Sequence, residues 1–161
     1  MNSPDSIKLL ELANSVKAEA LVIHFASNNS IQVYSKGFHH LAREAGYKIA
    51  WLLPVPMYDT SVPSVLWKMR GASLRTLQPF NLTEIDQLNN QLMSDGVMTF
   101  DFRPLLCLDG CLVADDELKP YYFDRGHLTL TGANYLRSTM VEAVEWLSSG
   151  NENLKICSGR M

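Results

Sequence analysis

The sequence predicts an α/β protein built on a parallel β-sheet. Three short apolar segments are typical of strands, at residues 20–26, 48–53 and 97–102, and stretches with helical periodicity lie before, between and after them. Such alternation gives a parallel sheet with right-handed crossovers and helices on both faces. The first segment is apolar almost throughout, which indicates a strand covered on both faces of that sheet.

Size and composition limit the classes of function. A chain of 161 residues suits one domain, so we expect a single domain over residues 1–150 and a polar tail over residues 151–161. The apolar content of 47% and the charged content of 19% are those of a soluble globular protein. The net charge of −3 argues against nucleic-acid binding, which needs clustered Lys and Arg. No apolar run predicts a membrane span or an export signal, so the chain expressed alone is expected in the cytoplasm.

Helices are expected around the three strands. The first begins with Ser3 as cap and Pro4 in the first turn, the second ends at Gly46, and the third begins with Asn81 and Glu84 as a capping box. Each helix has an apolar stripe at helical spacing. In the first it is Ile7, Leu10, Ala13 and Val16, and in the second Tyr34, Phe38, Leu41, Ala42 and Ala45. In the third it is Leu82, Ile85, Leu88 and Leu92, and in a last, C-terminal helix Ala133, Leu136, Met140, Val144 and Leu147.

Three histidines and one long connection have structural interpretations. We expect His24, inside the first strand, to be a hydrogen-bonded interior residue rather than a ligand. His39 and His40 lie beside the stripe of the second helix and are expected to be solvated. Residues 57–80 have an irregular pattern with a short helix at 61–69, and could line a substrate groove or pack as a surface excursion.

Asp124 and His127 form the candidate catalytic pair. They lie three residues apart in a turn, where Gly126 would allow the bend and Thr129 or Thr131 could cap the helix that follows. A carboxylate at this position can accept a hydrogen bond from one imidazole nitrogen, which leaves the other nitrogen free to take a proton from a nucleophile. The same spacing also arises by chance in surface turns, with a capping Asp and a solvated His.

Cys107 and Cys111 leave two alternatives open, a small disulfide loop and two free thiols. A zinc site would need two more ligands at the usual spacings, and a thioredoxin-type pair has two intervening residues rather than three. We therefore expect no metal. If the disulfide forms, the domain lies in an oxidising compartment. Cys157, near the polar tail, is expected to be a free thiol.

The region around the candidate pair resembles the last conserved block of the SGNH (GDSL-like) hydrolases, in the version found in the C-terminal domain of membrane sugar O-acyltransferases. The similar residues, at 121–133, are Tyr-Tyr-Phe-Asp-Arg-Gly-His-Leu-Thr-Leu-Thr-Gly-Ala. Upstream, Leu106–Cys111 is similar to the family's paired cysteines and Leu53–Pro56 to its strand followed by Val-Pro. The resemblance covers about residues 20–147 and implies that Asp124 and His127 belong to a Ser-His-Asp triad.

The chain departs from this family because it contains no Gly-Asp-Ser, the block whose Ser is the nucleophile. Asp5 and Ser6 are no substitute, since no apolar strand precedes them and Pro4 stands where the Gly should be. The resemblance implies a flavodoxin-like three-layer α/β/α sandwich with strand order 2-1-3-4-5, of which the three strands here match the third, fourth and fifth. We therefore expect an incomplete domain. Asn28 stands where the wider family has an oxyanion-hole Asn, without the neighbouring Gly and Asp, so turn formation is the alternative.

The resemblance implies an acyltransferase or esterase domain that moves O-acetyl groups to or from sugars of cell-surface polysaccharide, without a cofactor. His127 would act as general base on a serine that this chain lacks, and Asp124 would orient it. The implied partners are an acylated saccharide and a membrane acyltransferase domain or an upstream SGNH segment, on the periplasmic side of the inner membrane. The alternative is an inactive truncated remnant that acts as a binding domain. The free edge of strand 20–26 could also pair with a second copy of the chain.

Overall fold

The computed structural model describes residues 4–24, 31–69, 75–108 and 110–149, leaving aside the side chains of 4–6 and 31–37. The predicted fold class is confirmed, because helices surround a three-stranded parallel sheet. No helix among the described residues has the length and apolar content needed to cross a bilayer.

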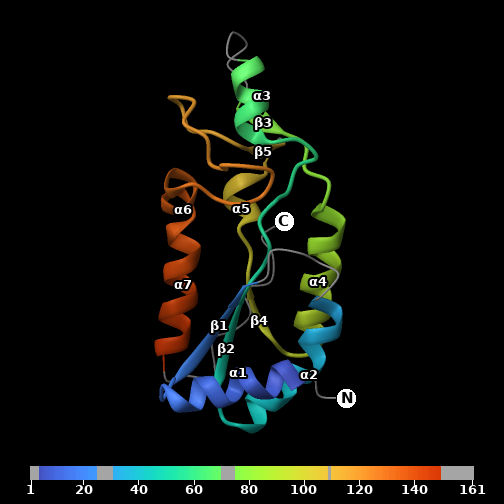
Figure 1. Ribbon diagram of the computed structural model, residues 1–161, viewed down its shortest axis with the longest axis vertical. Coiled ribbons are helices and arrows are strands. Elements are labelled where there is room, and N and C mark those ends of the chain that lie inside the picture. Colours follow the sequence, from blue (N-terminus) through green and yellow to red (C-terminus); the bar gives the residue numbers. More distant parts are fainter. Residues whose placement is uncertain (1–3, 25–30, 70–74, 109, 150–161) are drawn as a thin grey trace.

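The sheet has the strand order β1-β2-β4, with all neighbours parallel. Its strands are β1 (Ala20–His24), β2 (Lys48–Leu52) and β4 (Met98–Phe100), which lie within the three predicted segments. The central position of β2 agrees with its burial, since Ile49, Ala50 and Trp51 are all buried. A crossover that contains a helix joins each strand to the next along the chain (Figure 1).

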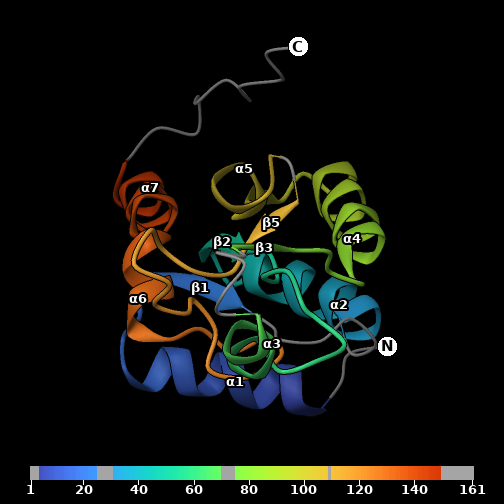
Figure 2. The same cartoon turned by 90° about the horizontal axis from the view of Figure 1, so that it is seen from above.

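Helices cover both faces of the sheet, as predicted. On one face, α2 (Ile31–Glu44) packs on β2 and α4 (Leu82–Ser94) packs on β4, while α1 (Pro4–Ser15) packs against α2. On the other face, α7 (Arg137–Ser148) packs on β2 and β4, so that the sheet lies between α4 and α7 (Figures 1 and 2). The buried residues of the first face are Phe38, Ala42, Ile49, Trp51, Leu53, Ile85, Leu88, Leu92 and Val97, and those of the α7 face are Ala50, Phe100 and Ala143.

Strand β1 is one of the two edge strands of the sheet, and β4 is the other. In the described part of the chain each has a strand neighbour on one side only. The register pairs Val22 with Ala50 and His24 with Leu52, so these four side chains belong to the face that α7 covers. Ala50 is fully buried there, whereas Val22 is 50% exposed. The cover that α7 provides therefore does not extend over β1.

A second core lies beyond the carboxyl ends of the strands. It lies among α3 (Val62–Lys68), α5 (Arg103–Leu106) and an antiparallel pair formed by β3 (Thr76–Leu77) and β5 (Cys111–Leu112) (Figure 1). Helix α3 agrees with the short helix predicted at 61–69. The two-residue strands β3 and β5 were not predicted, because so short a segment carries no periodicity. The buried residues of this core are Val55, Tyr58, Val62, Phe102, Leu106, Cys111, Val113, Tyr121, Tyr122 and Leu136.

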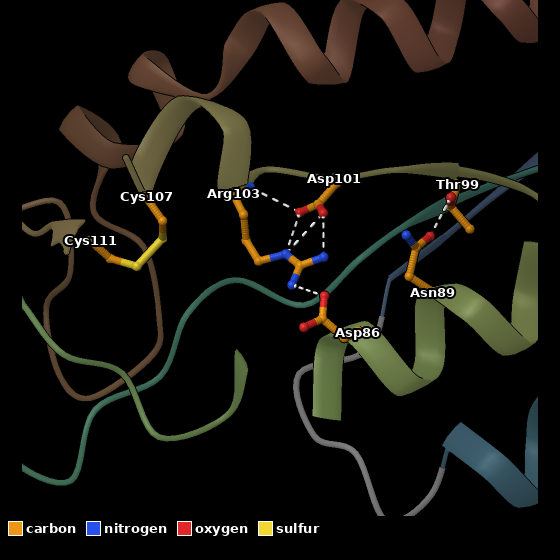
Figure 3. Close-up of polar contacts among 7 residues, drawn as sticks. All are labelled: Asp86, Asn89, Thr99, Asp101, Arg103, Cys107 and Cys111. Carbon is orange, nitrogen blue, oxygen red and sulfur yellow. Dashed lines mark hydrogen bonds and ion pairs between the residues drawn. A yellow bond between two sulfur atoms is a disulfide. The ribbon is translucent and has the colours of Figure 1, made fainter. Parts of the chain in front are cut away.

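Arg103 ties the end of β4 to α4. Its guanidinium contacts the carboxylate of Asp101, with Nη2 2.6 Å from Oδ2, and that of Asp86, with Nη1 2.5 Å from Oδ1 (Figure 3). Nearer the middle of the strand, the Thr99 hydroxyl donates a hydrogen bond of 2.7 Å to Oδ1 of Asn89 (Figure 3). These contacts fix β4 and the residues that follow it against α4.

The predicted capping role of Asn81 is wrong. Helix α4 begins at Leu82, yet the Asn81 side chain makes no capping hydrogen bond. It is fully buried, and its Oδ1 accepts the Met57 N–H at 2.7 Å while its Nδ2 donates to the Val55 carbonyl at 3.2 Å. These two backbone groups follow the last residue of β2, where buried polar groups still need partners. The tertiary contact therefore replaces the local cap.

The C-terminal helical segment is divided rather than continuous. Helix α6 (Leu130–Tyr135) and α7 separate at Leu136, which is fully buried. The predicted stripe is wrong at Val144, which is 56% exposed, because α7 turns Ala143 toward the sheet instead.

The predicted solvation of His39 is wrong, because this residue is buried. His40 is exposed, with 3.2 Å between its Nε2 and Oε1 of Glu44. Neither ring nitrogen of His39 has a hydrogen-bond partner among the described residues. Burial, followed by the charge of Arg43, holds the pKa of His39 below its usual value of 6.5. The fold therefore favours the neutral imidazole at this position.

Replacing Asn81 with Ala should destabilise the protein, because it leaves the Met57 N–H and the Val55 carbonyl buried without partners. Each orphaned group costs roughly 1–3 kcal/mol, so we expect the free energy of unfolding to fall by about 2–4 kcal/mol. Urea unfolding followed by circular dichroism measures the change. Asn90→Ala, at an exposed position of the same helix, is the matched control and should change stability by no more than about 0.5 kcal/mol. Equal losses in the two variants would contradict the role of Asn81.

Candidate active site

Hydrogen bonds close the turn that holds Asp124 and His127. The N–H of Phe123 donates to the carbonyl of His127 at 2.9 Å. Inside the turn, Oδ1 of Asp124 accepts the backbone N–H groups of Gly126 and His127, both at 2.8 Å. An aspartate that binds amides two and three residues further on is a common turn former. The carboxylate therefore shapes the turn through one oxygen and keeps the other available.

The second oxygen of Asp124 faces the imidazole of His127, with 2.6 Å between Oδ2 and Nδ1. An ionised carboxylate can only accept, so Nδ1 carries the proton and Nε2 is left as the basic nitrogen. The backbone N–H groups of His127 and Gly126, and after them the imidazole, lower the pKa of Asp124 from 3.8 to about 2. Both side chains meet solvent, with 65% of His127 and 41% of Asp124 exposed. The structure thus brings the predicted pair together at the surface.

The turn rests on the segment that follows β2. The N–H of Tyr58 donates to the carbonyl of Arg125 at 2.9 Å, and the N–H of Val62 donates to the carbonyl of Asp124 at 3.0 Å. Asn81 holds the beginning of this segment through its two buried hydrogen bonds. The position of the Asp124 backbone therefore depends on Asn81, more than forty positions earlier in the chain.

Two glycines permit close approaches at the site. Gly126 lies in a bend, as predicted, but without a left-handed φ. A Cβ there would lie 3.0 Å from Cγ of Met57, so the close approach of Met57 is what favours glycine. A Cβ on Gly132 would lie 2.2 Å from the carbonyl oxygen of Tyr121, which leaves no room for a side chain. Thr129 caps α6, as one of the two predicted caps, because its Oγ1 accepts the Gly132 N–H at 3.1 Å.

An apolar cavity of about 310 Å³ lies beside His127. It opens at the carboxyl ends of the strands, the rim where sites form in open parallel sheets. The described residues that line it are His24, Leu52, Val55, Met57, Phe102, Gly126, His127, Leu128 and Met140. Among them, His24 and His127 are the only titratable side chains.

Sequence reasoning missed His24 as a residue of this cavity. The expected hydrogen bond is present, with Nδ1 3.2 Å from the Leu52 carbonyl oxygen, but the residue is exposed rather than interior. Its ring meets the ring of Phe102 edge-on at 6.4 Å. The apolar run of β1 indicated cover on both faces, and no sequence signal distinguishes that case from a strand whose one face is open.

The remaining candidate residues lie away from the cavity or outside the described part. Cys107 and Cys111 are joined by a disulfide, and neither lines the cavity (Figure 3). Asn28, Cys157 and the tail lie outside the described residues, so the expected roles of Asn28 and Cys157 stay predictions. Within the described ranges, no three His, Cys, Asp or Glu side chains are placed to hold a metal ion.

The comparison with family models identifies residues 13–142 as an SGNH domain of the type fused to AT3 domains. The chain belongs to this family. The resemblance expected from the sequence is therefore confirmed, and the matched region contains both Asp124 and His127. Members are domains of the hydrolase and acyl-transfer class, and the AT3 fusion indicates a membrane acyltransferase domain as their partner. No curated protein matches the sequence.

Among solved structures, this SGNH domain is similar to the periplasmic domain of a lipopolysaccharide acetyltransferase from Salmonella ser. Paratyphi A, with a TM-score of 0.69 and 15% identity. The match covers 86% of this chain and 61% of that one, so the chain spans about three-fifths of the length of its structural relative. At this identity the likeness supports the fold, a mixed α/β arrangement of the SGNH kind.

The carboxyl group of Asp124 should titrate near pH 2, and mainly because of the turn rather than the imidazole. The backbone N–H groups remain in His127→Ala, so we expect the pKa of Asp124 in that variant to stay below 3.8. Because the folded-state pKa lies below the unfolded value, the stability from this carboxylate is complete above about pH 3.8 and is lost as the pH falls toward 2. Carbon-13 NMR of the side-chain carboxyl measures the titration. A return to 3.8 in His127→Ala would show that the imidazole is the main cause.

Proposed function

We propose that this chain carries the base and the orienting carboxylate of an SGNH acyl-transfer site that moves O-acetyl groups to or from saccharides. His127 is the general base, Asp124 orients it, and the nucleophilic serine belongs to polypeptide outside these 161 residues. The observation that carries the proposal is the 2.6 Å contact between His127 Nδ1 and Asp124 Oδ2 at the rim of an apolar cavity. That contact selects the tautomer in which Nε2 can accept a proton.

The reaction proceeds in two proton-coupled steps. As the serine oxygen attacks the carbonyl carbon of the acyl donor, Nε2 of His127 takes the hydroxyl proton, and the imidazolium forms beside the Asp124 carboxylate. His127 then gives this proton to the leaving oxygen, which yields an acyl-serine and a released alcohol. In the second step Nε2 deprotonates the accepting sugar hydroxyl, or water in an esterase, as its oxygen attacks the acyl carbon. The bond from the acyl carbon to the serine oxygen breaks, and the imidazolium returns the proton to that oxygen. Asn28 or backbone N–H groups would stabilise the oxyanion.

The open edge of β1 is where the serine-bearing polypeptide would pair. In the described part of the chain, this strand has no neighbour on that side, and His24 at its end lines the same cavity as His127. A strand added there would end at the rim near this cavity, because parallel strands bring their carboxyl ends to one edge of a sheet. The match covers 61% of the Salmonella domain, so that domain contains further polypeptide beyond the matched part. A second copy of the chain is the alternative occupant of the edge.

The working location in this proposal is the periplasmic side of the inner membrane, beside a membrane acyltransferase domain. The disulfide between Cys107 and Cys111 is compatible with an oxidising compartment. The related Salmonella domain is periplasmic, and the family is fused to AT3 domains.

A non-catalytic binding domain is the second candidate function. The observation in its favour is the absence of Gly-Asp-Ser from the 161 residues. Loss of the serine from such a triad costs on the order of a millionfold in turnover, so a chain that never meets a serine would be inert as a hydrolase.

A serine-directed fluorophosphonate probe tests the proposal. We expect no labelling of the 161-residue chain, and labelling of a form extended before Met1 by a Gly-Asp-Ser segment. In the extended form, His127→Ala should slow labelling by roughly 10⁴-fold or more, because the serine loses its base. Labelling of the short chain that disappears in His127→Ala would overturn the external serine. A folded extended form that fails to label would favour the binding domain.

The free edge of β1 should make the isolated chain self-associate, because an uncovered apolar strand is a template for pairing. Light scattering after size exclusion should therefore give a mass above that of one chain, and Val22→Lys should shift the mass toward the monomer by charging the open face beside the edge. Val141→Lys on α7, with 41% exposure, is the control and should change nothing. A stable monomer in the unmodified chain would contradict pairing through this edge.

A further inference from the structure

Phe123 places a large apolar ring in solvent directly beside the candidate base. It is 61% exposed and belongs to none of the buried clusters. Its ring stacks on the imidazole of His127, with 5.5 Å between the ring centroids and 19° between the ring planes. Singly exposed apolar side chains are common, so the exposure alone assigns no role to this ring, and the stacking contact with His127 is the observation that does.

The backbone explains why these two rings meet. The N–H of Phe123 donates to the carbonyl of His127 at 2.9 Å, and the flanking residues Tyr122 and Leu128 form an antiparallel bridge. Phe123 and His127 therefore face each other across the closed base of the turn, where opposing side chains interact. The backbone of the turn itself therefore brings the two rings together.

The hydrogen bond to Asp124 alone is a weak restraint on His127. The pair is solvent-accessible, and an exposed contact with a carboxylate shifts a conformational equilibrium by at most roughly fivefold. A stacked aromatic pair contributes a further bias of about two- to tenfold. Asp124 acts in the plane of the imidazole through Nδ1, whereas Phe123 acts on its face, so the two contacts restrain different rotations of the ring.

We propose that Phe123 is a positioning residue that holds the imidazole of His127 in the plane where Asp124 binds Nδ1 and Nε2 stays available to the cavity. The purpose of this restraint rests on the proposed function, while the restraint itself belongs to the turn and exists without a serine. Phe123 contacts no reacting atom in this account. Its effect passes entirely through the orientation and the tautomer of His127.

Nitrogen-15 NMR of the histidine side chains tests the proposal on the chain as it exists. Above the titration range of histidine, His127 should be mainly the Nδ1–H tautomer, with its Nδ1 proton slowed in exchange with water. In Phe123→Leu we expect that exchange to become about two- to tenfold faster, with a larger share of the Nε2–H tautomer. Phe123→Tyr keeps the stacking ring and should restore the values of the unmodified chain.

Phe80→Leu is the matched control, because Phe80 is 52% exposed and undergoes the same chemical change. It should leave the exchange of the His127 proton unaltered. Since Phe123 lies outside the buried clusters, Phe123→Leu should move the melting temperature by no more than about 2 °C.

Three results would overturn the proposal: unchanged exchange and tautomer in Phe123→Leu, an equal change in Phe80→Leu, or unfolding of Phe123→Leu, which would make the ring a folding residue.

These outcomes are separate from those of the labelling experiment with the fluorophosphonate probe. If the probe never labels an extended form while Phe123→Leu still loosens His127, the acyl-transfer function fails and the positioning contact stands. If labelling succeeds while Phe123→Leu leaves His127 unchanged, the positioning contact alone fails.

Discussion

The position of the candidate site depends on the buried amide of Asn81. Its two hydrogen bonds hold the segment that follows β2, and the backbone of that segment in turn binds the turn of Asp124 and His127. A primary amide suits this task because it offers an acceptor to one backbone N–H and a donor to one carbonyl at the same time. In a fully buried setting these bonds cannot be replaced by water, so the segment has one favoured path.

The carboxylate of Asp124 is held in place by the backbone N–H groups of its own turn. Its low pKa comes mainly from the amides of its own turn, so it stays ionised and correctly placed even though it meets solvent. His127 gains its tautomer from this carboxylate and a stacking partner from Phe123. In the proposed function, a pair held in this way would need little reorganisation when a nucleophile arrives, which is the property that electrostatic catalysis requires.

The two sides of the sheet differ in how they are finished. On the β4 side, Arg103 links the strand end to α4 and the disulfide closes the loop after α5. Both edge strands have a strand neighbour on one side only in the described part of the chain, but on the β1 side Val22 is also half exposed. His24, at the end of β1, lies in the wall of the cavity. In the proposed function, a strand that pairs with β1 would therefore end near this cavity.

The sequence by itself determined the alternation of strands and helices, the parallel sheet and the pairing of Asp124 with His127, because periodicity and a contact three residues apart are local properties of the chain. Only the tertiary structure decided that the Asn81 side chain binds the segment after β2 instead of capping its own helix, and that Val144 faces solvent. It also decided that His24, at the end of an apolar strand, lies exposed beside the cavity. Each of these outcomes depends on which groups from distant segments compete for the same hydrogen bonds and the same buried surface, and that competition exists only after the chain has folded.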